Sequence, residues 1–536
     1  MKKVNVFLLV ASCIFFAGCE GSEEKADLSI RAITVSPASL VLKPGQSQTL
    51  SVTVFPENAV NKKVRWTTSD PEVVDVNGAG DVSAIRQGSA TVTVTAEDGG
   101  EKTSCLVTVT AGDPVAFGAK GAPAIAVEGV WEKHTVVSVN GQIYVPEGKS
   151  LTVEEGVEII LSADAQDNSN TKIEFIVEGS LYCNGTEEDP VVFTIPAGER
   201  DRKTSGRYWG GIIGSAACPE ILLDHVRVEY TGAITTAASP SVTKGLFKAG
   251  GGDGMVAFNT NNPRGKYVIT RSTFRYTGED AIYVQGGECI FTHNLFYAVG
   301  NEGGEAINVK AGCKVDAAFN VMYSPNTNAF KLSNSGVGGD RFQAQINAYN
   351  NTVINAGWRR DPGKPKGGSV WAEGGLVNVF NNLIVNCMFA AKAPNFGAGG
   401  EEGVVQGSII DYNFYASGTA GSQVTQHLEN GTVTAYDGFK PGVKDVIYGA
   451  NDLSGNAPGA NDPRFVSFPF ATRSPLDYNF DESWDFHLQP DSPALDAAKV
   501  KTGFTPYFAA GITLNGKTFK SPLPAGYFGA FGGQNQ

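Results

Sequence analysis

The sequence is poor in the residues that build metal centres and basic surfaces. Among 536 residues there are 4 methionines, 5 histidines and 8 cysteines, and charged residues make up only 18%. The formal net charge is −13 at pH 7, which argues against a nucleic-acid partner because such a partner requires a basic face. Glycine is abundant instead, with 65 residues, as expected of a β protein dense in turns.

The cysteines lack the spacing of a zinc site, since no CxxC motif or histidine-rich cluster is present. Six lie beyond the N-terminal segment: Cys105, Cys183, Cys218, Cys289, Cys313 and Cys387. Cys289 and Cys313 occupy similar places in consecutive repeats, with Cβ atoms expected about 4.8 Å apart, beyond the roughly 3.5–4.5 Å that a disulfide prefers. We therefore expect free, buried cysteines.

Outside the first twenty residues, no apolar run approaches the roughly 18 residues that a helix needs to span a bilayer. The N-terminus itself has a basic start at Lys2 and Lys3, an apolar core from Val6 to Phe16 and small residues before Cys19. This pattern predicts a signal peptide over residues 1–18.

The sequence Phe16-Ala-Gly-Cys19 resembles the bacterial lipobox, in which the cysteine becomes the lipidated first residue. The resemblance implies a lipid anchor at Cys19, and several acyl chains give stable membrane attachment. Residues 19–28 form an acidic tether that resembles the export signal of some surface lipoproteins. The implied location is the cell outer membrane, with the protein exposed on the cell surface.

One sequence pattern recurs between residues 268 and 415. It consists of a β-rich run, a polar residue that is usually Asn, and further apolar positions. The polar positions are Ser272, Asn294, Asn320, Asn351, Asn382 and Asn413, spaced by 22, 26, 31, 31 and 31 residues. This period, with Gly/Asn turns and no helical periodicity, predicts a parallel β-helix. Its coils lie about 4.8 Å apart, so we expect the polar residues to bond one another as a ladder.

Residues 29–111 read as a separate module of short antiparallel strands, because apolar and polar residues alternate in Leu50–Val54 and Ala90–Thr95. About seven strands in this length predict an immunoglobulin-like sandwich. Trp66-Thr-Thr-Ser-Asp70 and Gly80-Asp-Val82 resemble the group 2 bacterial Ig-like family. The resemblance implies a spacer or adhesive module without catalysis. We expect Trp66 to be a buried core residue rather than a platform for a sugar.

Residues 112–124 are expected to be a linker, and 125–536 a β-helix domain with an N-terminal cap and an irregular C-terminal segment. Gly141–Gly148, Trp209–Ile212 and Tyr527–Phe531 resemble segments of right-handed β-helix surface proteins of the pectin-lyase-like kind. The predicted fold class is all-β: an N-terminal Ig-like β-sandwich followed by a right-handed parallel β-helix.

Polygalacturonase-like hydrolases need clustered aspartates and a Gly-His-Gly tripeptide, and this sequence has neither an Asp-Asp pair nor that tripeptide. The β-elimination lyases of the chondroitinase-B and alginate-lyase type are closer. Asn301-Glu-Gly-Gly-Glu305 followed by Lys310, with Lys331 one coil on, resembles their pattern. It implies Ca²⁺ at Glu302 and Glu305, Lys310 as the base and Lys331 as the second cation.

Two departures weaken that resemblance: lysine replaces the expected arginine, and the histidine that should follow is missing. The alternative is that Glu302 and Glu305 are solvated turn residues. Outside a lyase, no cofactor is expected.

The excursion from Gly357 to Gly375 offers a second binding hypothesis. Trp358, Arg359, Arg360 and Trp371 supply aromatic platforms and guanidinium groups suited to an acidic glycan. A solvated basic loop with one packed tryptophan is the alternative.

Together these features predict a monomeric surface lipoprotein that binds polysaccharide, or mediates adhesion, through a β-helix face without catalysis. Its partners would be a polysaccharide and, through the lipid anchor, the outer membrane. A calcium-dependent uronate lyase and a purely structural surface protein are the alternatives.

Overall fold

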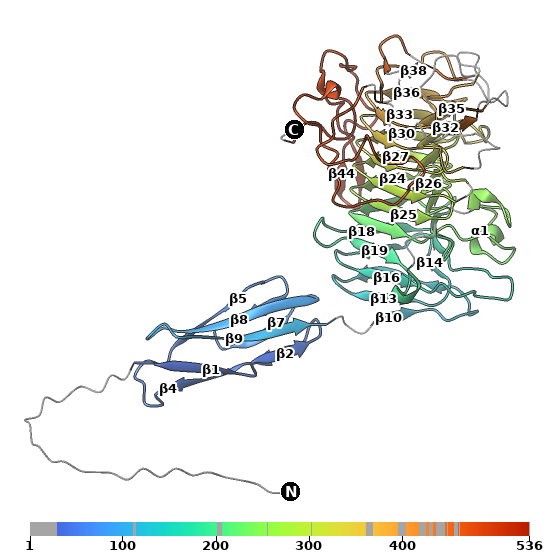
Figure 1. The fold of residues 1–536 in the computed structure, drawn as a ribbon. Coiled ribbons are helices and arrows are strands. Elements are labelled where there is room, and N and C mark those ends of the chain that lie inside the picture. The colour runs from blue at the N-terminus through green and yellow to red at the C-terminus, as the bar shows by residue number, and fades with distance from the viewer. Residues whose placement is uncertain are drawn as a thin grey trace, which may run out of the picture. The chain divides into compact units, whose positions relative to one another are not determined.

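The computed structural model describes residues 29–110, 114–200, 206–254, 256–301, 303–360, 368–394, 404–416, 425–427, 433–435, 445–447, 449–454, 459 and 461–534. The chain divides into two compact units, Met1–Gly112 and Asp113–Gln536 (Figure 1). The predicted lipid anchor Cys19 and the predicted ligand Glu302 lie outside the described residues. Within the described part of the chain, no helix is long and apolar enough to span a membrane.

The first unit is an Ig-like sandwich of short strands. They are β1 (Ala32–Ser36), β2 (Ser39–Leu42), β3 (Ser47–Thr49), β4 (Ser51–Phe55), β5 (Val64–Thr68), β6 (Val74–Val76), β7 (Asp81–Ala84), β8 (Gly88–Ala96) and β9 (Lys102–Val109). They pair as β2-β9-β8-β5, β3-β7-β6 and β1-β4. Alternate residues of β8 are buried, and Trp66 lies in the core with 9% of its surface exposed, as predicted.

The second unit is a stack of coils built from three parallel sheets, which we number by their first strands. The first sheet contains β10 (Val115–Phe117), β13 (Val136–Val139), β16 (Glu158–Leu161), β19 (Val191–Thr194), β22 (Val226–Glu229), β25 (Thr273–Thr277), β28 (Leu295–Val299), β31 (Val321–Tyr323), β34 (Thr352–Ile354), β37 (Leu383–Val385), β39 (Phe414–Ala416) and β42 (Leu453–Ser454).

The second sheet contains β11 (Ile125–Ala126), β14 (Ile143–Val145), β17 (Phe175–Val177), β20 (Ile212–Gly214), β23 (Phe258–Thr260), β26 (Ile282–Val284), β29 (Ile307–Val309), β32 (Phe330–Ser333) and β35 (Val370–Glu373). The third contains β12 (Gly129–Trp131), β15 (Ser150–Val153), β18 (Ser180–Asn184), β21 (Glu220–Asp224), β24 (Lys266–Thr270), β27 (Gly287–Thr292), β30 (Cys313–Ala318), β33 (Gln345–Tyr349), β36 (Leu376–Phe380) and β38 (Ile409–Ile410). The predicted fold class is confirmed.

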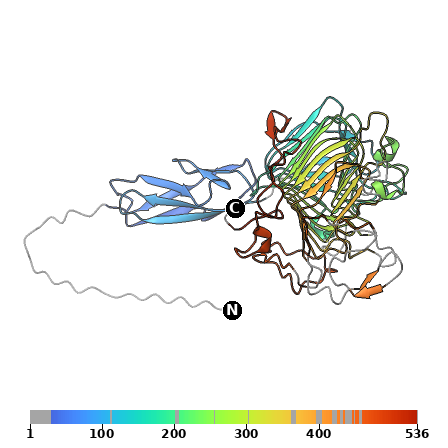
Figure 2. The same cartoon turned by 90° about the horizontal axis from the view of Figure 1, so that it is seen from above.

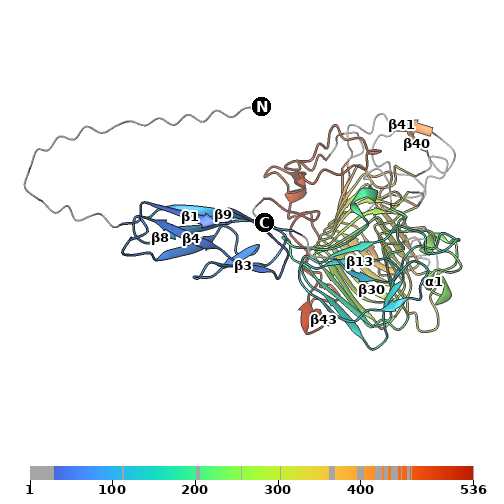
Figure 3. The ribbon, with the colours of Figure 1, turned by 90° about the horizontal axis from the view of Figure 1, so that it is seen from below.

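The stack of coils already begins within the segment expected to be a linker. β10 lies inside residues 112–124, and its Val115 pairs in parallel with Val137 of β13. Views along the stack show the strands of successive coils lying over one another around an interior (Figures 2 and 3). That interior is a continuous core of mainly Val, Ile, Leu and Phe, with stacked pairs such as Phe274 and Phe296, whose ring centroids are 5.5 Å apart.

The predicted ladder is present at one corner of the coils. From Asn294 to Asn413, each side-chain Nδ2 donates to the Oδ1 of the next ladder residue over 2.9–3.0 Å wherever a next asparagine follows. Asn294 Oδ1 in turn accepts from the backbone N–H of Ser272. The residue before each ladder position has φ between 50° and 60°, a left-handed conformation that costs about 1–3 kcal/mol and turns the chain at the corner.

The six cysteines of the described chain are free and buried, as predicted. Their neighbours in the interior are apolar, and burial raises the pKa of each thiol. They serve as small apolar core residues.

Two additions flank the coils. One is the loop of residues 231–257, which includes the short helices α1 (Pro240–Thr243) and η2 (Gly252–Gly254). It packs on the second sheet, where its Phe247 contacts Tyr283 of β26. The C-terminal segment, residues 461–534, carries η4 (Pro493–Leu495) and the hairpin of β43 (Ile512–Leu514) and β44 (Lys517–Phe519) and lies on another side of the stack (Figure 1). A further 3-10 turn, η1 (Ala197–Glu199), and the hairpin of β40 (Thr425–His427) and β41 (Val433–Ala435) complete the described elements.

Candidate functional site

The outer face of the second sheet carries a row of polar and aromatic side chains. Tyr283, Asn308, Lys331 and Trp371 are register partners on β26, β29, β32 and β35. Their neighbours along each strand, such as Ile307 and Phe330, belong to the core. Because side chains alternate along a strand, the row faces away from the core, with one residue per coil.

A cavity of about 150 Å³ opens on this face, and we call it the second-sheet cavity. It is lined by Gly252, Glu279, Asp280, Gly303, Gly304, Glu305, Asn308, Lys310, Thr327, Lys331 and Arg360. The sequence-predicted residues Glu305, Lys310 and Lys331 therefore lie together, and Arg360 from the predicted glycan loop joins them.

Two carboxyl groups face each other in the cavity. Asp280 and Glu305 stand at equivalent positions of consecutive coils, and Asp280 Oδ1 accepts a 2.8 Å hydrogen bond from the Glu305 N–H. Asp280 Oδ2 accepts another of 2.8 Å from Asn308 Nδ2. Burial and the negative charge of Glu305 hold the pKa of Asp280 well above its usual range.

Glu305 behaves in the opposite way. Burial acts to raise the pKa of Glu305, but the hydrogen bond from Asp280 and the positive charge of Lys331 outweigh it, so the pKa is lowered. The pair therefore shares one proton, which Asp280 holds, and Glu305 carries the charge.

The cations of the cavity have aromatic and acidic neighbours. Lys310 is 8% exposed, and its Nζ lies 5.5 Å from the centroid of the Tyr283 ring. Lys331 Nζ lies 3.8 Å from Glu373 Oε1. Glu279 is ion-paired to Arg207 at 3.4 Å, so part of the acidic charge is already neutralised. The arrangement suits an incoming anionic group held between amines and a guanidinium.

The same cavity also gathers oxygen atoms that could hold a cation. The described residues contain no group of three or more His, Cys, Asp or Glu side chains able to hold a metal ion. Oxygen atoms nevertheless lie close together here. Asn308 Oδ1 is buried and has no hydrogen-bond partner among the described residues, and the carboxyl groups of Asp280 and Glu305 line the same cavity. Once Asp280 has lost its proton, the two carboxylates and the amide oxygen would match the ligand chemistry of Ca²⁺.

Two of the four predicted glycan-binding residues anchor their loop instead. Trp358 is 5% exposed, packs in a small cluster with Met388 and Phe389, and donates a 2.7 Å hydrogen bond to the Asn386 carbonyl. Arg359 donates to backbone carbonyls of the preceding coils, among them Val299 at 2.7 Å. Desolvation lowers the pKa of Arg359 to about 10. Their hydrogen-bonding groups are turned to the protein rather than to a glycan.

Trp371 takes a different position. It lies half-buried on β35 beside Lys331, and its Nε1 donates a 2.8 Å hydrogen bond to Glu373 Oε2. Lys392 Nζ lies 5.4 Å from its ring centroid. Of the predicted loop residues, Arg360 and Trp371 are thus the ones on the side of the second-sheet cavity.

Sequence reasoning missed Asp280 and Asn308. Both have a signal in the repeat, because Asp280 stands one coil before Glu305 and Asn308 one coil before Lys331. Aligning the coils on the strands of the second sheet, rather than on the asparagine corner, would have brought these residues into one group.

Comparison with known proteins identifies both kinds of domain. Residues 29–107 match the bacterial Ig-like domain (group 2), and residues 124–220 match the pectate-lyase like beta helix domain. An Ig-like virion protein of Serratia phage KSP90 is 32% identical over 114 residues, covering 20% of this chain and 44% of that protein.

Several similar proteins carry the names of enzymes, and two of them serve as examples. A kappa-carrageenase of Pseudoalteromonas carrageenovora is 40% identical over 74 residues, covering 14% of this chain and 19% of that protein. An alpha-L-arabinofuranosidase of Bifidobacterium longum is 39% identical over 90 residues, covering 16% of this chain and 8% of that protein. The chain spans less than half the length of these relatives. It contains a bacterial Ig-like domain of group 2 and a pectate-lyase-like β-helix domain.

Proposed function

We propose that this chain is a carbohydrate-binding surface lipoprotein whose β-helix holds an acidic polysaccharide at the second-sheet cavity. The observation that carries the proposal is the convergence of Lys310, Lys331 and Arg360, from three different coils and loops, on one cavity. The lipobox-like sequence at Cys19 supports attachment to the outer membrane.

The chemistry of the cavity fits a polymer of uronate or sulfated sugars. Each carboxylate or sulfate forms charge-assisted hydrogen bonds with amines or a guanidinium, which are roughly twice as strong as neutral ones. Trp371, on the coil next to Lys331, offers an aromatic surface for a sugar ring. The pectate-lyase-like domain match supports a carbohydrate ligand. The matches to the kappa-carrageenase and the arabinofuranosidase have about the length of the Ig-like domain. They therefore support a protein that works on or near carbohydrates, but they do not support a particular reaction.

The test is calorimetric titration of the chain with polygalacturonate, alginate, chondroitin sulfate and neutral dextran. We expect binding of at least one anionic polymer, none of dextran, and a loss of affinity of about tenfold in Lys331→Met, since a charged hydrogen bond contributes about 1.5–3 kcal/mol. Lys499→Met, which removes an exposed cation from the C-terminal segment, is the matched control. Equal binding of dextran, or equal effects of the two variants, would contradict the proposal.

A second candidate, cleavage of a uronate polymer by β-elimination, is favoured by one observation. The lyase pattern in the sequence lacks its arginine, yet Arg360 supplies a guanidinium to the same cavity as Glu305 and Lys310. In this reaction the Lys310 amine takes the proton next to the uronate carboxyl, a C=C bond forms, and the glycosidic C–O bond breaks with water protonating the leaving oxygen. Ca²⁺ held by Asp280, Glu305 and Asn308 would supply neutralisation of the uronate charge.

The readout for cleavage is the ultraviolet absorbance of the unsaturated product, followed with each anionic polymer. We expect Lys310→Ala to abolish the signal and Lys499→Ala to leave it unchanged. Binding of a polymer without any absorbance change would remove the lyase candidate and leave the binding proposal standing.

A further inference from the structure

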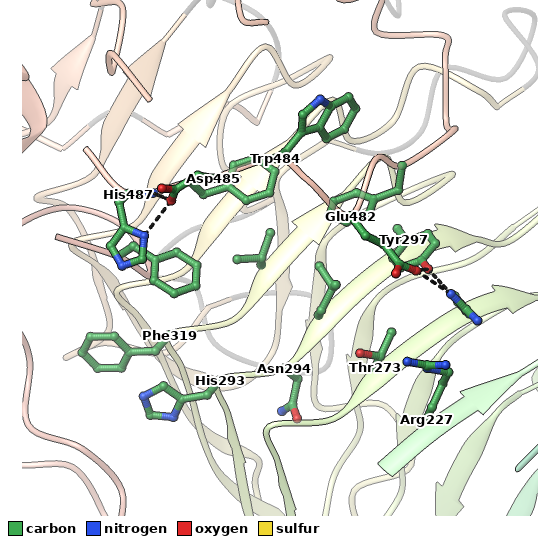
Figure 4. A pocket seen from close by; sticks show the side chains of 16 residues that line it. Arg227, Thr273, His293, Asn294, Tyr297, Phe319, Glu482, Trp484, Asp485 and His487 are labelled. Atoms are coloured by element: carbon green, nitrogen blue, oxygen red, sulfur yellow. Dashed lines mark hydrogen bonds and ion pairs between the residues drawn. The ribbon is translucent and has the colours of Figure 1, made fainter. Parts of the chain in front are cut away.

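A second and larger cavity, of about 560 Å³, lies between the first sheet and the C-terminal segment (Figure 4). Its lining includes Arg227, Thr273, Leu295 and Val321 from the first sheet and Phe480 and Trp484 from the C-terminal segment. We call it the first-sheet cavity. It shares no lining residue with the second-sheet cavity, and its size is that of an ordinary small-molecule site.

The floor of the first-sheet cavity changes character along the stack. Arg227, Thr273, Leu295 and Val321 are register partners on β22, β25, β28 and β31. Two coils therefore present aliphatic side chains, and the two preceding coils present a hydroxyl and a guanidinium. In Figure 4, Arg227 and Thr273 lie together at one end of the cavity, away from His293 and Phe319.

The walls are aromatic. The C-terminal segment contributes Phe480 and Trp484, whose ring centroids are 5.3 Å apart in an edge-on arrangement. At the other end, the His293 ring lies parallel to the Phe319 ring at 5.3 Å. Aromatic surfaces above an aliphatic floor form a slot that suits a flat apolar ring.

Most of the charged and titratable lining residues have a polar partner. Arg275 forms ion pairs with Glu229 and Glu482, and Asp485 accepts a 2.6 Å hydrogen bond from the His487 ring. Among the residues that the structure describes, the Arg227 side chain has no ion pair and no hydrogen bond. Arg227 is therefore a cation without a paired acid among these residues, and it sits at the polar end of the cavity.

We propose that the first-sheet cavity binds an aromatic carboxylate. The ring lies over Leu295 and Val321 between the aromatic walls, and the carboxylate accepts hydrogen bonds from Arg227 and Thr273. A planar carboxylate matches the fork of a guanidinium. A pyranose fits this floor less well, because its hydroxyl groups would face aliphatic side chains without hydrogen-bond partners.

The experiment is calorimetric titration of the full chain with cinnamate, its methyl ester and glucuronate. We expect cinnamate to bind, the ester to bind about tenfold more weakly, and glucuronate not to displace cinnamate, since the ester cannot form the charged hydrogen bonds. No binding of cinnamate, equal affinity for acid and ester, or displacement of cinnamate by glucuronate would each overturn the proposal.

Two variants locate the site. Arg227→Met should weaken cinnamate about tenfold and leave the ester unchanged, whereas Leu295→Trp, which fills the floor, should weaken both. Arg264→Met, at an exposed turn that lines neither cavity, is the control and should change neither. Thermal unfolding of each variant verifies that it folds, and unchanged cinnamate affinity in folded Arg227→Met would overturn the assignment.

Discussion

The same coils present very different outer faces on two of their three sheets. On the first sheet, the C-terminal segment lies over Leu295 and Val321 and makes an aromatic cavity in which Arg227 has no ion pair with any other described residue. On the second sheet, Asp280, Glu305 and Lys310 make a small charged cavity. The interior behind both faces is the same apolar core, so the repeat specifies the scaffold and the outer positions specify the chemistry.

The largest expected effect contrasts a ladder asparagine with an outward one. Asn351 bonds Asn320 and Asn382 and donates to the Ala317 carbonyl. Asn351→Ala leaves several buried groups unsatisfied at about 1–3 kcal/mol each, so we expect it to lower the free energy of unfolding by about 4 kcal/mol. Asn308→Ala should cost under about 1.5 kcal/mol, because its Nδ2 makes one bond to Asp280.

Urea unfolding followed by circular dichroism measures both changes. If Asn308→Ala destabilised the chain as much as Asn351→Ala, the division into a structural corner and a functional face would be wrong.

An intermediate effect separates two neighbouring arginines. Arg359→Met removes hydrogen bonds to the Val299 and Ser324 carbonyls, and we expect it to lower stability by about 2 kcal/mol. Arg360→Met should leave stability nearly unchanged and weaken binding of the acidic polymer about tenfold, because Arg360 lines the second-sheet cavity. Thermal unfolding and calorimetric titration of both variants measure these effects. The prediction is wrong if Arg360→Met lowers stability and Arg359→Met weakens binding of the polymer instead.

The smallest expected effect is a change in the pH dependence of stability. The raised pKa of Asp280 means that the folded state holds a proton that the unfolded state loses above about pH 4. The contribution of Asp280 therefore makes the free energy of unfolding fall as the pH rises from about 4 toward the pKa of Asp280 in the folded state. Asp280→Asn, which mimics the protonated form, should become more stable relative to the wild type as pH increases. Urea midpoints measured at several pH values test this, and a difference independent of pH would contradict it.

The sequence predicts much of the scaffold because scaffold positions repeat. Asn320 and Asn351 occupy the same position in successive repeats, and the stacking of the coils brings their side chains into the ladder. Glu305, Lys310 and Lys331 were predicted from a resemblance to β-elimination lyases, and they line one cavity because residues of nearby coils lie close together.

Residues outside the repeat could not be predicted in this way. Whether Trp358 faces the solvent or the protein depends on Met388 and Phe389, which no period relates to it. The first-sheet cavity depends on Glu482 reaching Tyr297, 185 residues earlier in the chain. No local pattern in the C-terminal segment encodes that contact.

The ladder corner also determines where the chain tolerates changes in length. The step from Ser272 to Asn294 takes 22 residues, and that from Asn320 to Asn351 takes 31. The longer coil places its extra residues between β32 and β33, and the next coil places them between β34 and β35. With one corner held in register, the other turns are open to insertion, so a new binding loop grafted there would leave the coils above and below it unshifted.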